Sequence, residues 1–421
     1  MDAAILSKLL SPEGWALLAA LPPYDERQAM KTVTTLRAEG VAPDLAAAVV
    51  TQSRLRARAR AKFGDFADGM LFTADGLEQA TRLLVAALHA RRYLDAGITA
   101  LADLTCGIGA DSLAFAGTGL RVVATDLDEC TAAIARWNLR HFPEADVRHA
   151  DGLGLDLAAE GIDGVYADPA RRTGGSGGRS RRIFDPRAYE PPLDAVWALR
   201  DAVPAVGVKV GPGIAHEGLP EDAETQWVSV DGDVVEAGLW FGPLAPDGPG
   251  RSALVLRTFT DDDGKEHTLS RTVRGDTGEP EVGAVGRYLY EPDGAVIRAG
   301  LVAQAAAELG GRLVDPTIAY VTTDDPADLP PARPADPAGA QAPLATGYRV
   351  LDTMPFGLKR LKSYLRDRNV GRLTIKKRGT AVVPEQLRKQ LVLTGTEEAT
   401  IVLTRVAGNQ QVLVVDPLGA V

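Results

Sequence analysis

Short apolar runs that end in an acidic residue alternate with segments of helical periodicity through the middle of the chain. Strands are predicted over residues 101–103, 121–126, 147–151 and 162–168, with helices after the first two. Alternation of this kind is typical of a parallel sheet covered by helices. The pattern therefore predicts an α/β fold for residues 96–259.

A β-hairpin is predicted near the end of this region. A further strand over residues 206–210 is followed by two runs rich in β-branched and aromatic residues, 226–230 and 234–241. Asp231, Gly232 and Asp233 separate the two runs, and Asp-Gly between such runs is a strong hairpin signal.

The preceding region has a helical pattern. Residues 1–95 are predicted to form a helical domain, with helices over residues 12–21, 24–39, 43–62 and 74–90.

The end of the chain divides into two parts. Residues 260–344 are interpreted as a connecting segment that contains a helix over residues 299–309 and a proline-rich linker over 324–344. Residues 345–421 are predicted to form a small α/β domain, with a basic amphipathic helix over residues 358–365.

A glycine turn follows the first predicted strand. Gly107 and Gly109 lack a Cβ, so the backbone there can approach a ligand closely. A dinucleotide fingerprint would need a third glycine at position 112, where the chain has Ser112, and this argues against a nicotinamide-dependent oxidoreductase. Asp126 ends the next strand close to the roughly 20 residues beyond the turn at which a carboxylate reaches ribose hydroxyls.

Four acidic motifs in order resemble those of class I S-adenosylmethionine-dependent methyltransferases: residues 103–109, Asp126, Asp151 and residues 168–171. Each acid alone could merely end a strand or cap a helix, but three at nucleoside-binding spacing favour a cofactor site. The resemblance covers residues 96–258. It implies a Rossmann-like, seven-stranded, mostly parallel sheet with a final antiparallel hairpin, and S-adenosylmethionine as the cofactor.

The resemblance also implies which residues contact the cofactor, and residues 75–80 are expected to contribute to the floor of the site. The implied contacts are Asp103, Cys106, Gly107, Gly109, Asp126, Leu127, Asp151 and Asp168.

The acceptor is expected at Asp168-Pro169-Ala170-Arg171. In amino-methyltransferases the equivalent turn offers a carboxylate and a carbonyl that orient the target amine, so Asp168 and Pro169 are the candidate catalytic residues. The aromatic residue that stacks on the acceptor in that family is missing here. The turn is also similar to that of uracil-5-methyltransferases, which need a cysteine after strand five. This chain has Lys209 there, so covalent catalysis is not expected.

Other candidate groups are few. The two cysteines, Cys106 and Cys130, exclude a disulfide framework and a four-cysteine zinc site, and no metal is expected. Cys106 is interpreted as a small buried side chain. His216 is either a base beside the site or a surface histidine.

Basic residues are concentrated in three places, although the net charge is −10. Residues 359–378 contain nine basic residues and one acidic residue, which favours a phosphate-binding surface. Residues 171–182 combine arginines with glycines beside the predicted acceptor turn. Residues 54–62 are interpreted as a solvated helix face. The candidate substrate-binding residues are Arg171, Arg172, Lys359, Arg360, Lys376, Lys377 and Arg378.

The last 75 or so residues resemble the THUMP-like domain that is appended to some bacterial methyltransferases, and THUMP domains proper bind RNA. The sequence thus predicts an enzyme that methylates a base nitrogen of tRNA or rRNA, with RNA as its partner. Two alternatives remain: a methyltransferase of a small molecule or protein, and a catalytically inactive RNA-binding protein. The chain starts with Met1 and Asp2, unlike a signal peptide, and no apolar run approaches the ~20 residues of a membrane span, so a cytoplasmic protein is expected.

Overall fold

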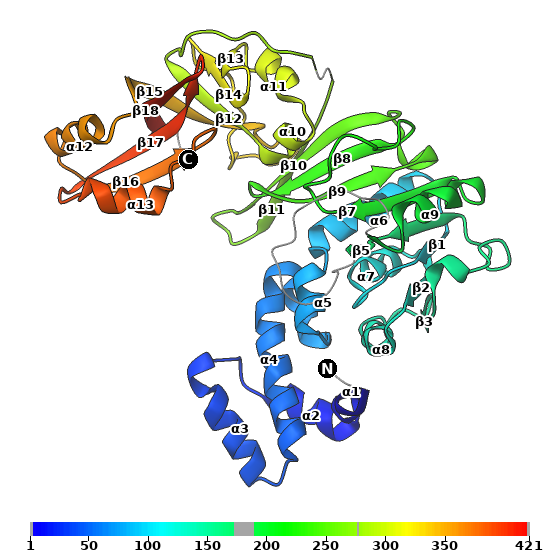
Figure 1. The fold of residues 1–421 in the computed structure, drawn as a ribbon. Coiled ribbons are helices and arrows are strands. Elements are labelled where there is room, and N and C mark those ends of the chain that lie inside the picture. Colours follow the sequence, from blue (N-terminus) through cyan, green and yellow to red (C-terminus); the bar gives the residue numbers. More distant parts are fainter. Residues whose placement is uncertain (1–2, 172–188, 276–277, 419–421) are drawn as a thin grey trace. The chain divides into compact units, whose positions relative to one another are not determined.

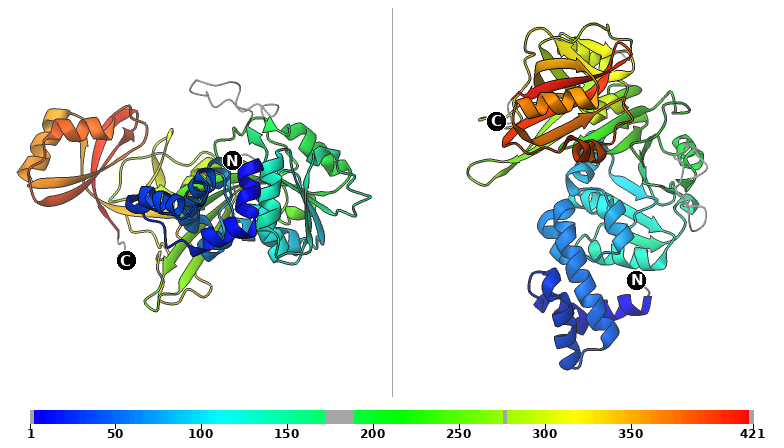
Figure 2. Two further views of the ribbon diagram at one scale, coloured as in Figure 1. Left: turned by 90° about the horizontal axis from the view of Figure 1, so that it is seen from below. Right: turned by 60° about the vertical axis from the view of Figure 1, so that its left-hand side comes forward.

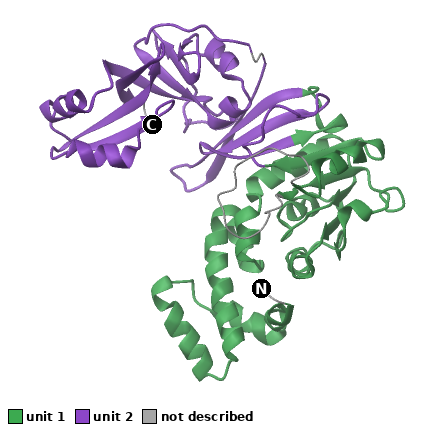
Figure 3. Ribbon diagram, in the orientation of Figure 1, with its two compact units in different colours: residues 1–210, 239–249 green, residues 211–238, 250–421 purple. Residues whose placement is uncertain are grey.

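The computed structural model describes residues 3–171, 189–275 and 278–418. The chain divides into two compact units (Figure 3). Unit 1 comprises residues 1–210 and 239–249, and unit 2 comprises residues 211–238 and 250–421.

Unit 1 begins with helices, as the periodicity predicts (Figure 1). They are α1 (Ala3–Leu10), α2 (Pro12–Ala20), α3 (Ala29–Ala38), α4 (Pro43–Phe63), α5 (Ala74–Gln79) and α6 (Leu83–Asp95), with 3-10 turns at Glu26–Gln28 and Gly64–Gly69. The Ser11 side chain caps α2 by accepting from the Gly14 N–H, while Pro12 and Pro43 occupy first turns, where no N–H is needed.

The prediction of a single helix over residues 74–90 is wrong, because the chain is extended between α5 and α6. The ammonium of Lys62 on α4 donates to the last carbonyls of α5, so that helix end is satisfied without further helical turns. These carbonyls belong to Leu77, Glu78 and Ala80. The break leaves Thr81 outside both helices.

The basic run on α4 is only partly solvated. Arg56 is 9% exposed, donates to the Met70 carbonyl at 2.9 Å and stacks its guanidinium on Trp15, 4.7 Å from the ring centroid. Burial lowers the pKa of Arg56 to about 10. The prediction of a solvated face is therefore wrong for Arg56 and for Lys62, which caps α5.

Five parallel strands form the centre of unit 1, in the order β3-β2-β1-β4-β7. They are β1 (Ala100–Asp103), β2 (Arg121–Asp126), β3 (Ala145–His149), β4 (Gly164–Ala167) and β7 (Ala205–Val210). The strand order reverses its direction at β1, and ligands of such sheets bind at the carboxyl ends of the strands beside this point.

Helices and short turns connect these strands. They are α7 (Ala110–Gly117), α8 (Glu129–Asn138) and α9 (Leu193–Ala198), with 3-10 turns at Gly152–Gly154 and Leu199–Asp201. A further 3-10 turn, Gly242–Leu244, lies later in the chain than these strands. A two-stranded ladder of β5 (Ala170–Arg171) and β6 (Tyr189–Glu190) follows β4 along the chain.

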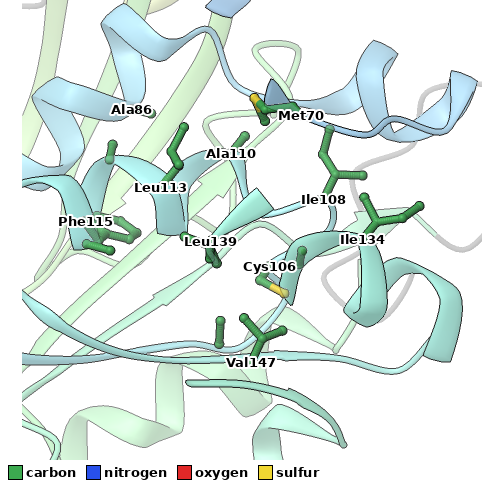
Figure 4. Packing of buried hydrophobic residues seen from close by; sticks show 14 of the residues in the cluster. Met70, Ala86, Cys106, Ile108, Ala110, Leu113, Phe115, Ile134, Leu139 and Val147 are labelled. Atoms are coloured by element: carbon green, nitrogen blue, oxygen red, sulfur yellow. The ribbon is translucent and has the colours of Figure 1, made fainter. Parts of the chain in front are cut away.

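One hydrophobic cluster joins the N-terminal helices to the sheet (Figure 4). Met70, Ile108, Phe115 and Leu139 belong to it, and each is no more than 3% exposed. The cluster also contains residues of α1, α2 and α4, so the helices and the sheet of unit 1 share one core.

The predicted hairpin is present in β8 (Glu224–Val230) and β9 (Asp233–Trp240), which are neighbours in the sheet. Asp231 and Gly232 between them have φ of 54° and 92°, the positive values that a type I′ turn requires.

The expected number of seven strands is wrong, because the sheet has nine, in the order β11-β10-β8-β9-β7-β4-β1-β2-β3. The two additional strands extend the sheet beyond β8: β10 (Gly250–Thr260) pairs parallel to β8, and β11 (Glu266–Arg274) pairs antiparallel to β10.

Unit 2 also contains a seven-stranded sheet in the order β13-β14-β12-β15-β18-β17-β16. Its strands are β12 (Tyr288–Pro292), β13 (Arg312–Asp315), β14 (Ile318–Thr323), β15 (Ala345–Pro355), β16 (Val370–Lys377), β17 (Glu397–Val406) and β18 (Asn409–Pro417). Its helices are α10 (Gly294–Arg298), α11 (Val302–Glu308), α12 (Leu358–Asp367) and α13 (Pro384–Leu391).

Alternating side chains of this sheet enter two cores. Ile401 and Leu403 on β17 pack with Leu361 of α12 and Leu387 of α13, whereas Val402 between them packs in the second core, with residues of β12 and β14. Figure 2 shows α12 and α13 beside the sheet in two further views. Within the described ranges, every helix is too short or too polar to cross a bilayer.

Candidate functional site

A cavity of about 660 Å³ lies in unit 1 at the carboxyl ends of the parallel strands. Its wall includes the turns after β1, β2, β3 and β4, together with α5 and the residues that follow it. Of the predicted cofactor and acceptor residues, seven line it: Asp103, Cys106, Gly107, Asp126, Leu127, Asp151 and Asp168. Gly109 and Pro169 are not among the residues that line it.

The glycine turn and Asp126 are joined by hydrogen bonds. Gly107 has φ of 55° and donates its N–H to Asp126 Oδ2 at 3.1 Å, and the N–H of Asp128 donates to Oδ1 at 2.8 Å. A Cβ at position 107 would meet no atom within 4 Å, so that face of the turn is open. Gly109, with φ of 85°, is the N-cap residue that precedes α7. Burial raises the pKa of Asp126.

Asp103 lies at the end of β1 and is 1% exposed. It accepts from the hydroxyl of Ser112 at 2.5 Å and from the N–H of Thr105 at 3.3 Å. Burial raises the pKa of Asp103 to about 7; the Ser112 hydrogen bond opposes this, and the negative charges of Asp111 and Asp168 add to it. Ser112, which departs from the dinucleotide fingerprint, therefore forms a hydrogen bond with the acid at the end of β1.

The other predicted cofactor residues differ in exposure. Leu127 is 56% exposed and presents an apolar side chain to the cavity, while Asp151 accepts from the Leu153 N–H at 3.0 Å. Cys106 is 7% exposed and lies in the hydrophobic cluster near Val147 (Figure 4). Burial, with the charges of Asp103 and Asp126, raises the pKa of its thiol, so it is not an activated nucleophile.

The turn predicted to bind the acceptor begins at Asp168, directly after β4. Its N–H donates to Thr105 Oγ1 at 2.7 Å, which ties the turn to the glycine loop. Lys209, at the end of β7, forms an ion pair with Asp168 Oδ2. Pro169 is buried and Ala170 lines the cavity; Arg171 is the residue at the position where the amino-methyltransferase turn has its aromatic residue.

Several polar residues in this wall and directly behind it were not predicted from the sequence as parts of the site. Thr81, which is buried and lies in the cavity wall at the break after α5, donates to Asp111 at 2.6 Å and accepts from Lys209 at 3.0 Å. Asp111 also contacts His89 Nδ1 at 2.9 Å. The signal for Lys209 was present, because a lysine is unusual in a buried parallel strand. Thr81 gave no signal, because it lay inside a predicted helix.

The cavity is acidic. Among the described residues that line it, eight carry a carboxylate and none is Lys, Arg or His; the acids are Asp75, Asp103, Asp111, Asp126, Asp128, Asp151, Asp168 and Glu190. Such a lining favours cationic ligands. A nucleoside that carries a sulfonium and an amino group fits this charge, the open face of Gly107 and the carboxylate of Asp126. No cluster of three or more metal-ligating side chains occurs in the part of the chain that the structure describes.

The candidate substrate residues lie in different surroundings. Lys359 and Arg360 are exposed on α12. Lys376 and Arg378 on or beside β16 both pair with Glu291, at 2.7 and 3.3 Å, and Lys377 donates to a backbone carbonyl. The Arg171 side chain and the whole of Arg172 lie outside the described residues, as do the other arginines of that cluster.

His216 belongs to unit 2, and both of its ring nitrogens are engaged there. Nε2 donates to the Arg298 carbonyl at 2.6 Å, and Nδ1 accepts from Arg251 at 2.7 Å. The ring also packs edge-on against Trp227. These contacts favour a structural role.

Comparison with known proteins agrees with this geometry. Residues 345–417 match the family described as THUMP domain-like, and residues 2–59 match a family described as a domain of unknown function. The crystal structure of a proposed methyltransferase from Porphyromonas gingivalis W83 has a TM-score of 0.67 at 20% identity, covering 94% of this chain and 99% of that one, so the two share a fold.

Two curated relatives come from strains of Mycobacterium tuberculosis, and both are named uncharacterized S-adenosylmethionine-dependent methyltransferases. Each is 34% identical to this chain over 380 residues, which are 87% of this chain and 94% of the relative. Because the similarity extends over nearly the whole length of both proteins, this chain belongs to the S-adenosylmethionine-dependent methyltransferases, enzymes that use S-adenosylmethionine as their cofactor.

Proposed function

We propose that this methyltransferase modifies a base nitrogen of structured RNA, a tRNA or an rRNA. The observation that carries the proposal is a set of exposed cations on α12 in the THUMP-like region, here called the α12 basic face. It consists of Lys359, Arg360, Lys362 and Arg366 on the helix and Arg368, the residue directly after it.

The opposite side of α12 explains why these cations are exposed. Leu361 and Leu365 are both 0% exposed and pack in the core of the sheet, so the helix must turn its charged side outward. Arg368 stacks on Tyr364, with its guanidinium carbon 3.5 Å from the ring centroid. A surface that combines cations with an aromatic ring suits RNA, because cations contact the phosphates and aromatic rings stack on accessible bases.

The cofactor contacts are proposed from the cavity lining. Asp126 lines the cavity and is proposed to accept from the ribose hydroxyls, and the open face of Gly107 would let the backbone approach the ligand. Asp151 and Leu127, at neighbouring strand ends, are proposed to contact the adenine.

The acceptor is proposed to bind beside Asp168 and Pro169. Asp168 accepts a hydrogen bond from the N–H of the acceptor and turns the nitrogen lone pair toward the methyl group. S-adenosylmethionine supplies a methyl group bound to a sulfonium. The lone pair forms the new N–C bond as the C–S bond breaks, the electron pair of that bond stays on sulfur, and the surplus proton on nitrogen passes to water.

A second function has one observation in its favour. The acidic lining of the cavity, including Asp168 and Glu190, would also suit a cationic amine of a protein or small molecule. Such an acceptor has no need of the α12 basic face, which is why RNA is preferred.

Mass spectrometry of nucleosides from a deletion strain and its parent tests the proposal. We expect one methylated nucleoside of tRNA or rRNA to disappear in the deletion strain and to return with the wild-type gene, but not with Asp168→Asn. In parallel, the purified enzyme is offered RNA, soluble protein and small molecules from the deletion strain with labelled cofactor. Label in protein or small molecules, with an unchanged nucleoside profile, would replace RNA as the substrate.

A further inference from the structure

Lys209 and Asp168 occupy matching positions on neighbouring strands. β4 and β7 pair in parallel with Ala167 opposite Val208, so Asp168, directly after β4, and Lys209, near the end of β7, lie at the same edge of the sheet. The Lys209 side chain is 12% exposed and that of Asp168 is 31% exposed. An ion pair at this depth is screened less than a surface pair.

Lys209 is itself held in place by a line of hydrogen bonds that runs into the core. Its ammonium donates to Thr81 Oγ1 at 3.0 Å, and the Thr81 hydroxyl donates to Asp111 at 2.6 Å. Asp111 contacts His89 Nδ1 at 2.9 Å, and the hydroxyl of Tyr166 lies 3.3 Å from the same nitrogen. The ammonium is therefore positioned from β7, from the segment after α5 and from α7.

The remaining charges around the pair come from four elements. Lys62 on α4 is close enough that the charge of Lys209, after burial, helps to lower the pKa of Lys62 to about 8. Asp103 on β1 interacts with the charge of Asp168. Burial alone raises the pKa of Asp111 on α7, but His89 on α6 and the charge of Lys209 outweigh it, so this pKa is lowered.

We propose that Lys209 is the positioning residue for Asp168 in methyl transfer: its ammonium holds Oδ2 and keeps the carboxylate ionised and correctly turned toward the acceptor nitrogen. The inference rests on the proposed acceptor site at Asp168, but not on the acceptor being RNA. An aromatic residue that would orient the acceptor by stacking is missing here. Lys209 supplies part of that orientation instead, because its charge and position hold the Asp168 carboxylate that contacts the acceptor. Asp168 lies in a wall that carries several other acids, and the ammonium of Lys209 offsets their repulsion of its carboxylate.

Three substitutions separate charge from hydrogen bonding. Lys209→Met removes both, Lys209→Gln keeps a donor without charge, and Lys209→Arg keeps the charge. Lys31→Met, on the exposed surface of α3, is the matched control. Initial rates are measured between about pH 5 and 9 with whichever fraction the wild type labels, RNA, protein or small molecules.

For Lys209→Met we expect kcat to fall by at least about tenfold, the scale of one charge-assisted hydrogen bond, with affinity for S-adenosylhomocysteine unchanged within about twofold. The pH at which activity declines on the acid side should rise, because the carboxylate has lost its stabilising cation. Lys209→Arg should retain more activity than Lys209→Gln. Lys209→Met combined with Asp168→Asn should lose no more than Asp168→Asn alone.

Several outcomes would overturn the proposal. An unchanged pH profile, equal activity of the Gln and Arg variants, or a parallel loss of S-adenosylhomocysteine affinity would assign Lys209 a merely structural role. A double-mutant cycle on the thermal midpoint tests the pair without turnover, and additive losses would mean that the two residues do not interact. Wild-type activity in Asp168→Asn would remove the acceptor site itself. Label outside RNA would remove only the RNA proposal.

Discussion

Asp103 is a carboxylic acid that folding buries in the wall of the unit 1 cavity. In the unfolded chain it ionises near its ordinary pKa of about 3.9. In the folded chain burial raises that pKa to about 7. Between these values the folded state holds a proton that the unfolded state has lost, so the contribution of Asp103 to stability is lost as the pH rises.

We therefore expect the cofactor-free protein to lose stability as the pH rises toward the Asp103 pKa of about 7, by an amount that Asp103→Asn removes. Urea unfolding of both proteins at about pH 5 and about pH 8 measures this. The variant should be the more stable of the two at the higher pH and should bind the cofactor less tightly. Parallel pH dependence in the two proteins would contradict the prediction.

Asp126 carries the proposed ribose contact. Asp126→Ala is expected to weaken S-adenosylmethionine binding at least about tenfold, the scale of one charge-assisted hydrogen bond. Calorimetry on the folded variant measures the affinity. Asp65→Ala, whose side chain is 97% exposed and outside the cavity lining, is the control. Equal affinities of the variant and the wild type would remove Asp126 from the site.

At the scale of the element, α12 presents its cations to solvent while cations on β16 are already paired. Lys376 and Arg378 share Glu291, so their charge is partly neutralised within unit 2. We expect the α12 basic face to contribute more to RNA binding than this pair does.

Replacing Lys359 and Arg360 by Gln should lower the slope of log affinity against log salt by about 1 to 2, because each phosphate contact contributes about 0.7 to 0.9. Different RNAs should weaken alike, since phosphate contacts do not read sequence. Filter binding across salt concentrations measures the slope. Lys31→Gln with Arg37→Gln removes the same charge from α3 and should leave the slope unchanged. An equal change in both variants would indicate a net-charge effect.

At the scale of the whole molecule, the THUMP-like match begins inside a sheet. Strands β12, β13 and β14 precede residue 345, yet β12 pairs with β15 over Tyr288–Pro292. Leu289 and Tyr320 share a core with Leu413. The matched residues and the segment before them are therefore parts of one folded sheet.

A chain that ends at residue 344 is expected to lose the fold of β12 to β14, because β12 loses its partner strand and the shared core opens. Hydrogen exchange of residues 288–323, compared with a chain that ends at residue 418, measures this. Retained protection of those amides would show that the three strands fold without the THUMP-like region.

The local sequence pattern was enough to predict where the strands with acidic ends and the hairpin turn lie along the chain. The strands that end at Asp103 and Asp126 and the Asp231–Gly232 turn follow from short-range periodicity and backbone preference, so sequence alone predicted them. The number of strands in the sheet and the break between helices at residues 80–82 did not follow from the local pattern. Edge pairing of β10 with β8 and the capping of α5 by Lys62 depend on residues far apart in the chain.

The sequence by itself determined the family, the cofactor motifs and the excess of cations near the end, because these reside in residue identity and spacing. Only the tertiary structure decided which charged side chains are paired, which are buried and which face solvent. It paired Lys209 with Asp168, and it buried Arg56 with its guanidinium stacked on Trp15. It paired Lys376 with Glu291 and left α12 exposed. The physical reason is that ionisation and hydrogen bonding depend on burial and on the nearest partner, and only the folded chain fixes either.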